Sequence, residues 1–157
     1  MVTGTRSVLG AVGWFVLCFA AAGIGSIFVP GTWYQTLVKP SWTPPSWLFG
    51  PVWTLLYGMM AAAAWLVWKR YGLSGALVPL AAFVVQLALN AAWSWLFFGL
   101  HRPGLAFTEI VLLWLAILAT LLLFWSEERL AGVLLIPYIA WVSFAAVLNF
   151  TLWRLNA

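Results

Sequence analysis

One apolar stretch of the chain carries three polar side chains on a single helical face. Gln86, Asn90 and Ser94 are spaced i, i+4 and i+8, so at ~100° per residue they point the same way, with Trp93 and Phe97 beside them. Amide and hydroxyl groups inside a membrane helix are costly unless they face protein or a cavity. The spacing therefore predicts either a polar and aromatic wall that places hydrogen bonds around a ligand, or hydrogen bonds to neighbouring helices.

Three tryptophans on three different stretches could line a flat, apolar slot. Trp53, Trp93 and Trp141 are its expected walls, and Tyr34 and Pro44 are its expected roof. Such a slot suits a planar aromatic ligand, through stacking and a few placed hydrogen bonds. The alternative is that these aromatic residues belong to ordinary core packing.

A small residue on the last apolar stretch supports the ligand interpretation. Ala145 follows Trp141 by one helical turn and shares its face with Leu148 and Leu152. An alanine between large neighbours leaves room for another group.

No conventional catalytic or metal-binding motif accompanies these residues. The chain has one cysteine, Cys18, and one histidine, His101, which together make neither a nucleophile and base pair nor a metal-ligand set. Its seven basic residues are scattered, so nucleic acid is not an expected partner. Any chemistry would have to come from aromatic side chains, a bound pigment or light.

The composition decides which elements position these residues. The chain has 157 residues, of which 66% are hydrophobic and 6% are charged, whereas soluble domains carry about 25% charged residues. Its mean hydropathy is +1.06. We therefore expect an integral, multi-pass membrane protein.

Five stretches are long and apolar enough to cross a bilayer, for which about 20 residues are needed. We expect a single all-α domain over residues 1–157, built as a compact bundle of five transmembrane helices. The first stretch also resembles the end of a signal peptide, but its apolar run is long enough for a retained span. The expected spans are residues 8–29, 47–68, 75–99, 104–125 and 131–153.

The long first connection, residues 30–46, is rich in tryptophan and proline. Trp33, Trp42 and Pro45 are among its rigid residues, and a segment preset in shape loses little entropy on ordering. We expect this connection to be a lid over one end of the bundle. The alternative is an aromatic belt at the membrane interface, where tryptophan and tyrosine collect.

The face opposite the polar one on residues 75–99 is a stripe of small residues. Its members fall within about 40° on a helical wheel, and such stripes let helices approach closely in lipid. The stripe predicts either a homodimer contact or tight packing inside one bundle. It consists of Ala81, Ala88, Ala92 and Gly99.

Glu109 is the one acid well inside an expected span. A buried acid indicates a functional site by default, but Arg102 lies seven residues earlier on the same face and is an alternative salt-bridge partner. Basic residues at the two ends of the expected spans are nearly balanced, so the positive-inside rule assigns no orientation.

Three motifs give the chain a family resemblance. WYQTLVKPSWTPPSWLFGPVWTLLYG (33–58), QLALNAAWSWLFFG (86–99) and LLIPYIAWVSFAAVLNF (134–150) resemble the translocator protein family, also called the tryptophan-rich sensory protein or peripheral benzodiazepine receptor family. The resemblance implies a five-helix membrane protein that forms homodimers, with the first connection capping a ligand pocket. It also implies a receptor for porphyrins such as protoporphyrin IX or a haem-like tetrapyrrole, for isoquinoline carboxamides and benzodiazepines, and in some members for cholesterol. We expect that no cofactor is required.

The resemblance also implies roles for individual residues. Its ligand-binding positions correspond to Tyr34, Pro44, Trp53, Tyr57, Asn90, Trp93, Ser94, Trp141 and Ala145. Light-dependent breakdown of protoporphyrin, as in some bacterial members, would involve Trp53 and Trp141, and transport of porphyrin or sterol is a further alternative. A relaxed sterol motif, Leu148, Phe150 and Arg154, stands where the family carries one, although such motifs are weak.

Overall fold

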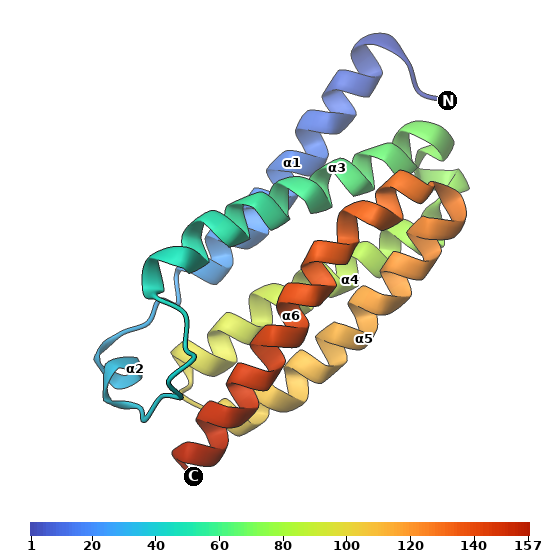
Figure 1. The fold of residues 1–157 in the computed structure, drawn as a ribbon. Helices are drawn as coiled ribbons and strands as arrows, with labels where there is room; N and C mark the ends of the chain where they lie inside the picture. Colours follow the sequence, from blue (N-terminus) through green and yellow to red (C-terminus); the bar gives the residue numbers. More distant parts are fainter.

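Five long helices dominate the computed structural model, which describes residues 1–157 (Figure 1). All five are long and apolar enough to cross a membrane, which confirms the expected helical class. The chain termini lie at opposite ends of the bundle (Figure 1). The helices are α1 (Gly4–Ser26), α3 (Phe49–Gly75), α4 (Leu77–Ser94), α5 (Pro103–Glu127) and α6 (Arg129–Leu155).

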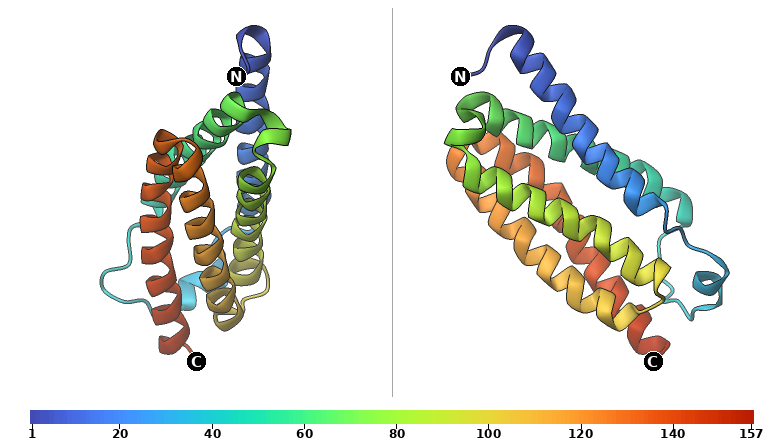
Figure 2. Two further views of the ribbon diagram at one scale, coloured as in Figure 1. Left: turned by 90° about the vertical axis from the view of Figure 1, so that its right-hand side faces the viewer. Right: turned by 180° about the vertical axis from the view of Figure 1, so that it is seen from behind.

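The five helices pack as a ring in the order α1, α3, α6, α5 and α4, and α4 closes the ring on α1 (Figure 2). Helix α1 packs closely on α3 where Gly10 faces Trp68, since a Cβ at Gly10 would overlap the Trp68 ring. Trp65 Nε1 also donates to the carbonyl oxygen of Ser7, at 3.0 Å. Elsewhere α1 buries little, and its buried residues are Ser7, Cys18 and Ala21.

Helix α3 continues past the position where we expected it to end. The long side chains of Lys69 and Arg70 do not interrupt a helix, and the break comes at Gly72, whose φ of 71° and ψ of −176° are non-helical. Such backbone is readily adopted only by glycine. Arg70 Nη1 pairs with Glu128 Oε2 at 2.6 Å, which joins the ends of α3 and α5.

The α5–α6 junction is a single residue, Glu128, with extended backbone. Such a short junction makes α5 and α6 antiparallel neighbours, as the sequence predicts. The two helices come so close there that a Cβ at Gly132 would lie 2.9 Å from Trp125 Cα.

The end of the third span is a π-helical turn, η2 (Trp95–Gly99). Its wider loop brings the Leu100 N–H to the carbonyl oxygen of Trp95 at 2.8 Å, and such turns are frequent at functional sites. Phe97 points inward and is 1% exposed. It packs with Ala106, Leu148 and Leu152 in a small apolar cluster, separate from the main core.

Candidate ligand-binding site

A cavity of about 460 Å³ opens among all five long helices. This volume falls in the range of about 300–1,000 Å³ that is typical of small-molecule pockets. Most of its lining is hydrophobic. The cavity lies at the end of the bundle where the connection between α1 and α3 folds, because residues of that connection form part of its wall.

The structure brings together almost every residue expected to bind a ligand. Pro44 is the exception, since it does not line the cavity. Two other residues of the same connection, Pro30 and Tyr34, do line it. The expected residues in the lining are Tyr34, Trp53, Tyr57, Asn90, Trp93, Ser94, Trp141 and Ala145.

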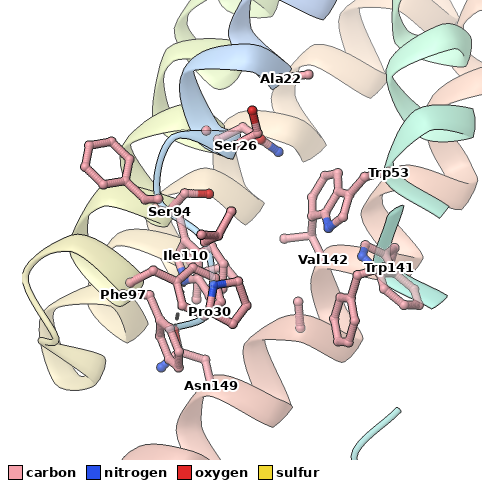
Figure 3. A pocket seen from close by; sticks show the side chains of 18 of the residues that line it. Ala22, Ser26, Pro30, Trp53, Ser94, Phe97, Ile110, Trp141, Val142 and Asn149 are labelled. Atoms are coloured by element: carbon pink, nitrogen blue, oxygen red, sulfur yellow. Dashed lines mark hydrogen bonds between the residues drawn. The ribbon is translucent and has the colours of Figure 1, made fainter. Parts of the chain in front are cut away.

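The aromatic walls face each other across the cavity. Figure 3 shows Trp53 and Trp141 on one side and Ser94 and Phe97 on the other. Phe49 supports Trp141 edge-on, with ring centroids 5.8 Å apart. Trp93 stacks on Phe97 at 5.0 Å. The expected face of α6, which runs from Trp141 to Leu152 through Ala145 and Leu148, lines the cavity throughout.

Asn90 both lines the cavity and ties three helices together. Its Oδ1 accepts a hydrogen bond from Tyr57 Oη at 2.6 Å, and its Nδ2 donates to Tyr138 Oη at 2.8 Å. Tyr138 Oη in turn donates to Gln86 Oε1 at 2.8 Å. Gln86 and Asn90 therefore both hydrogen-bond neighbouring helices, as one of the two interpretations predicts, and Asn90 also lines the cavity.

A second asparagine, Asn149, joins α6 to α4 and to the start of α5. Its Oδ1 accepts from Trp93 Nε1 at 2.9 Å, and its Nδ2 donates to the carbonyl oxygen of Pro103 at 2.8 Å. Sequence reasoning missed Asn149, although a polar residue inside an apolar span was a signal that could have found it.

The sequence-based site also included no residue of helix α1. It contributes Phe19, Ala22, Gly25 and Ser26 to the lining. Three of these residues are small and are spaced i, i+3 and i+4, namely Ala22, Gly25 and Ser26. This spacing is only a weak sequence signal that α1 lines a cavity. Gly25 lies beside α4, where a Cβ would make an ordinary contact with Ser94 Oγ at 3.4 Å.

The connection between α1 and α3 contains α2 (Thr32–Thr36) and the 3₁₀ turn η1 (Ser46–Leu48). Trp33 stacks on His101, with ring centroids 4.3 Å apart. Tyr34 meets Phe98 edge-on at 5.6 Å and lies under Lys39 Nζ at 4.7 Å. Burial raises the pKa of the Tyr34 phenol.

Trp42 and Pro45, also expected in a lid, lie on the outer side of this connection. Trp42 packs edge-on against Phe144 at 5.9 Å but is 45% exposed. Pro45 is exposed. Neither residue lines the cavity.

The remaining predicted residues lie outside the cavity, apart from Leu148. In the small-residue stripe, Ala81, Ala88 and Gly99 are exposed and Ala92 is half-buried. Within the sterol motif, Leu148 is 6% exposed and lines the cavity, whereas Phe150 is 43% exposed. Arg154 is also exposed, so the three residues do not form one surface.

Glu109 does not pair with Arg102. Arg102 is exposed, and both carboxyl oxygens of Glu109 are buried without a hydrogen-bond partner. The pairing alternative is therefore wrong, because Arg102 lies outside the helix, at its N-cap, where its side chain reaches solvent.

Comparison with known proteins shows which family this chain belongs to. The model of the TspO/MBR family matches residues 14–154. The chain belongs to the TspO/MBR family. Family membership and the five spans together make it an integral, multi-pass membrane protein.

Relatives within the TspO/MBR family come from bacteria and animals. Protein CrtK of Rhodobacter capsulatus is 46% identical over 147 residues, which cover 91% of this chain and 90% of that protein. Tryptophan-rich protein TspO of Chlorobaculum tepidum is 47% identical, over 89% of this chain and 91% of that protein. The human translocator protein is 44% identical, over 85% and 82% respectively.

Proposed function

We propose that this protein is a membrane receptor, or sensor, that binds porphyrins such as protoporphyrin IX in the cavity among its five helices. The supporting observation is the pair of facing aromatic walls, with Trp53 and Trp141 opposite Phe97 and the Trp93 ring stacked on Phe97. Flat apolar rings bind between such walls by stacking. A relative from Cereibacter sphaeroides that is named tryptophan-rich sensory protein supports a sensory role.

The cavity also suits other flat apolar ligands, including isoquinoline carboxamides and benzodiazepines. Its lining combines a mostly hydrophobic surface with a few polar groups, which is the composition of small-molecule sites. Sterol binding has weaker support, because the residues of the sterol motif point in different directions.

A titration in the dark tests the porphyrin proposal. Purified protein in detergent is titrated with protoporphyrin IX, and the Soret absorbance of the pigment reports binding. We expect saturable binding that weakens about tenfold or more in Trp53→Phe and Trp141→Phe, through lost stacking and packing. Trp95→Phe is the matched control, because Trp95 is 46% exposed and does not line the cavity. Absence of saturable binding to the wild type would overturn the proposal.

Illumination of the same samples separates binding from photochemistry. A pigment product that forms only in light, and only with Trp53 and Trp141 intact, would assign these residues a catalytic role. Unchanged pigment under light would leave a receptor. Transport is tested separately, by movement of porphyrin across the membrane of sealed vesicles that contain the protein.

A further inference from the structure

A second hollow of the protein, a groove of about 540 Å³, lies on the outer surface of the bundle between α5 and α6. Its side chains are apolar except for one serine, and none of them lines the ligand cavity. Val111 and Val147 are exposed, so the groove opens outward, onto a face that meets lipid in a membrane-spanning bundle. Its lining consists of Phe107, Val111 and Trp114 on α5 and of Ser143, Ala146, Val147 and Phe150 on α6.

The groove runs along two helices that lie side by side (Figure 2). At one end Phe107 packs on Phe150, with ring centroids 5.1 Å apart. At the other end Trp114 Nε1 donates to Ser143 Oγ at 2.8 Å. The two ends are about 10 Å apart along each helix, at 1.5 Å per residue, and the small side chain of Ala146 lies between them. The groove therefore has the direction in which lipid acyl chains lie.

The groove offers no free polar group to a ligand. Its one hydroxyl, on Ser143, accepts from Trp114 Nε1 and donates to the carbonyl oxygen of Ile139 at 2.8 Å. A hydroxyl or amide placed in the groove would find no hydrogen-bond partner there, which is costly. The lining thus favours a plain hydrocarbon chain, with the polar part of its molecule outside the groove.

Two arginines, Arg102 and Arg154, lie near the Phe107 end of the groove. Trp153 stacks on Phe107 at 6.1 Å, and a Cβ at Gly104 would lie 3.0 Å from the Trp153 ring, so α5 and α6 are in contact there. Arg102 comes two residues before Gly104, and Arg154 follows Trp153 directly. Both arginines are exposed, at the end of two spans, where lipid headgroups lie.

No acidic side chain neutralises this pair of arginines. The one ion pair of the protein joins Arg70 to Glu128, and Glu127 and Glu128 are at the opposite end of α5. The remaining acid, Glu109, is buried. Arginine binds phosphate oxygens through paired N–H donors, and basic residues at the ends of membrane helices attract anionic lipid headgroups.

We propose that the groove between α5 and α6 binds an acyl chain of an anionic phospholipid, and that Arg102 and Arg154 hold its phosphate. The apolar lining selects the chain, and the unpaired positive charge selects the headgroup. The occupant is a lipid of the surrounding bilayer, so this site is separate from the proposed porphyrin site.

Native mass spectrometry of the detergent-purified protein counts its bound lipids. We expect one phosphatidylglycerol to bind more tightly than phosphatidylcholine, whose headgroup has no net charge. Each basic residue near an anionic headgroup is worth about fivefold in affinity, so the double variant Arg102→Gln and Arg154→Gln should lose this preference, with phosphatidylglycerol weakened about 25-fold. Arg129→Gln is the matched control, because Arg129 is exposed at the other end of α6. Equal affinity of the two lipids for the wild type, or an unchanged preference in the double variant, would overturn the proposal.

The acyl chain is tested separately from the headgroup. Ala146→Leu fills part of the groove and should weaken binding of both lipids, whereas Ala119→Leu, at an exposed position of α5 outside the groove, should not. Phosphatidylglycerol with a photoactivatable group in its chain should crosslink to the wild type within residues 107–114 and 143–150. Crosslinks spread evenly over the outer faces of α1 and α4, or displacement of the lipid by cholesterol, would overturn the proposal. Porphyrin takes no part in these measurements, so the two proposals fail independently.

Discussion

The side-chain amide of Asn156 holds both backbone polar groups of Val38. Asn156 Oδ1 accepts from the Val38 N–H at 2.9 Å, and Asn156 Nδ2 donates to the Val38 carbonyl oxygen at 3.0 Å. The end of α6 is thereby joined to the connection between α1 and α3, across 118 positions of the chain.

Asn156→Ala should loosen this connection. We expect hydrogen exchange at the Val38 amide to become about fivefold faster, because a lost hydrogen bond is worth about 1 kcal/mol. Mass spectrometry of the exchanged protein measures the change. Thr151→Ala is the control, since its hydroxyl bonds only within α6, to Val147. Unchanged exchange at Val38 would mean that other contacts, such as the stack of Trp33 on His101, hold the connection.

Tyr138→Phe should destabilise the protein more than it affects ligand binding. The substitution removes the hydroxyl between Asn90 and Gln86 and leaves two buried polar groups unpaired, at a cost of about 1–3 kcal/mol. Tyr138 does not line the cavity. Thermal unfolding in detergent measures the loss of stability.

A matched control for Tyr138 is Tyr71→Phe. The Tyr71 hydroxyl bonds the carbonyl oxygen of Glu127 at an exposed site, so its loss should change the free energy of unfolding by no more than about 0.5 kcal/mol. Equal effects of the two substitutions would contradict the importance of the buried hydrogen bonds.

Gly132→Ala should destabilise the junction of α5 and α6. The added Cβ would lie 2.9 Å from Trp125 Cα. Because a backbone atom cannot move away without shifting the helix, we expect the free energy of unfolding to fall by about 1–3 kcal/mol. Gly58→Ala, in α3, is the control. Nothing lies within 4 Å of a Cβ there, so the alanine should stabilise the helix by about 0.5–1 kcal/mol. Unfolding in a denaturing detergent distinguishes the two signs.

Ala88→Phe should weaken self-association if the exposed small-residue stripe of α4 is a homodimer contact. A bulky ring prevents the close helix approach that small residues allow. Sedimentation in detergent measures the dimer fraction. Leu112→Phe is the control, because Leu112 is 54% exposed on α5, away from the stripe. An unchanged dimer in Ala88→Phe would exclude the stripe as the contact, and a monomeric wild type would exclude the dimer.

Much of the site could be predicted because its residues repeat at helical spacing. Trp141, Ala145, Leu148 and Leu152 share one face of α6 by periodicity alone, and the tertiary structure keeps that face on the cavity. The cost of polar groups in an apolar span likewise singled out Asn90. These inferences depend only on local geometry, which the sequence carries.

The sequence itself determined the fold class and the membrane location. A chain with 66% hydrophobic residues, arranged in five long runs, cannot cover a water-facing surface with polar side chains. Only the tertiary structure decided which helices meet. It placed α1 in the cavity wall, left Pro44 out of it, and separated Glu109 from Arg102. Those outcomes depend on the angles between helices and the path of an irregular connection, and such contacts between distant residues leave no periodic pattern in a single sequence.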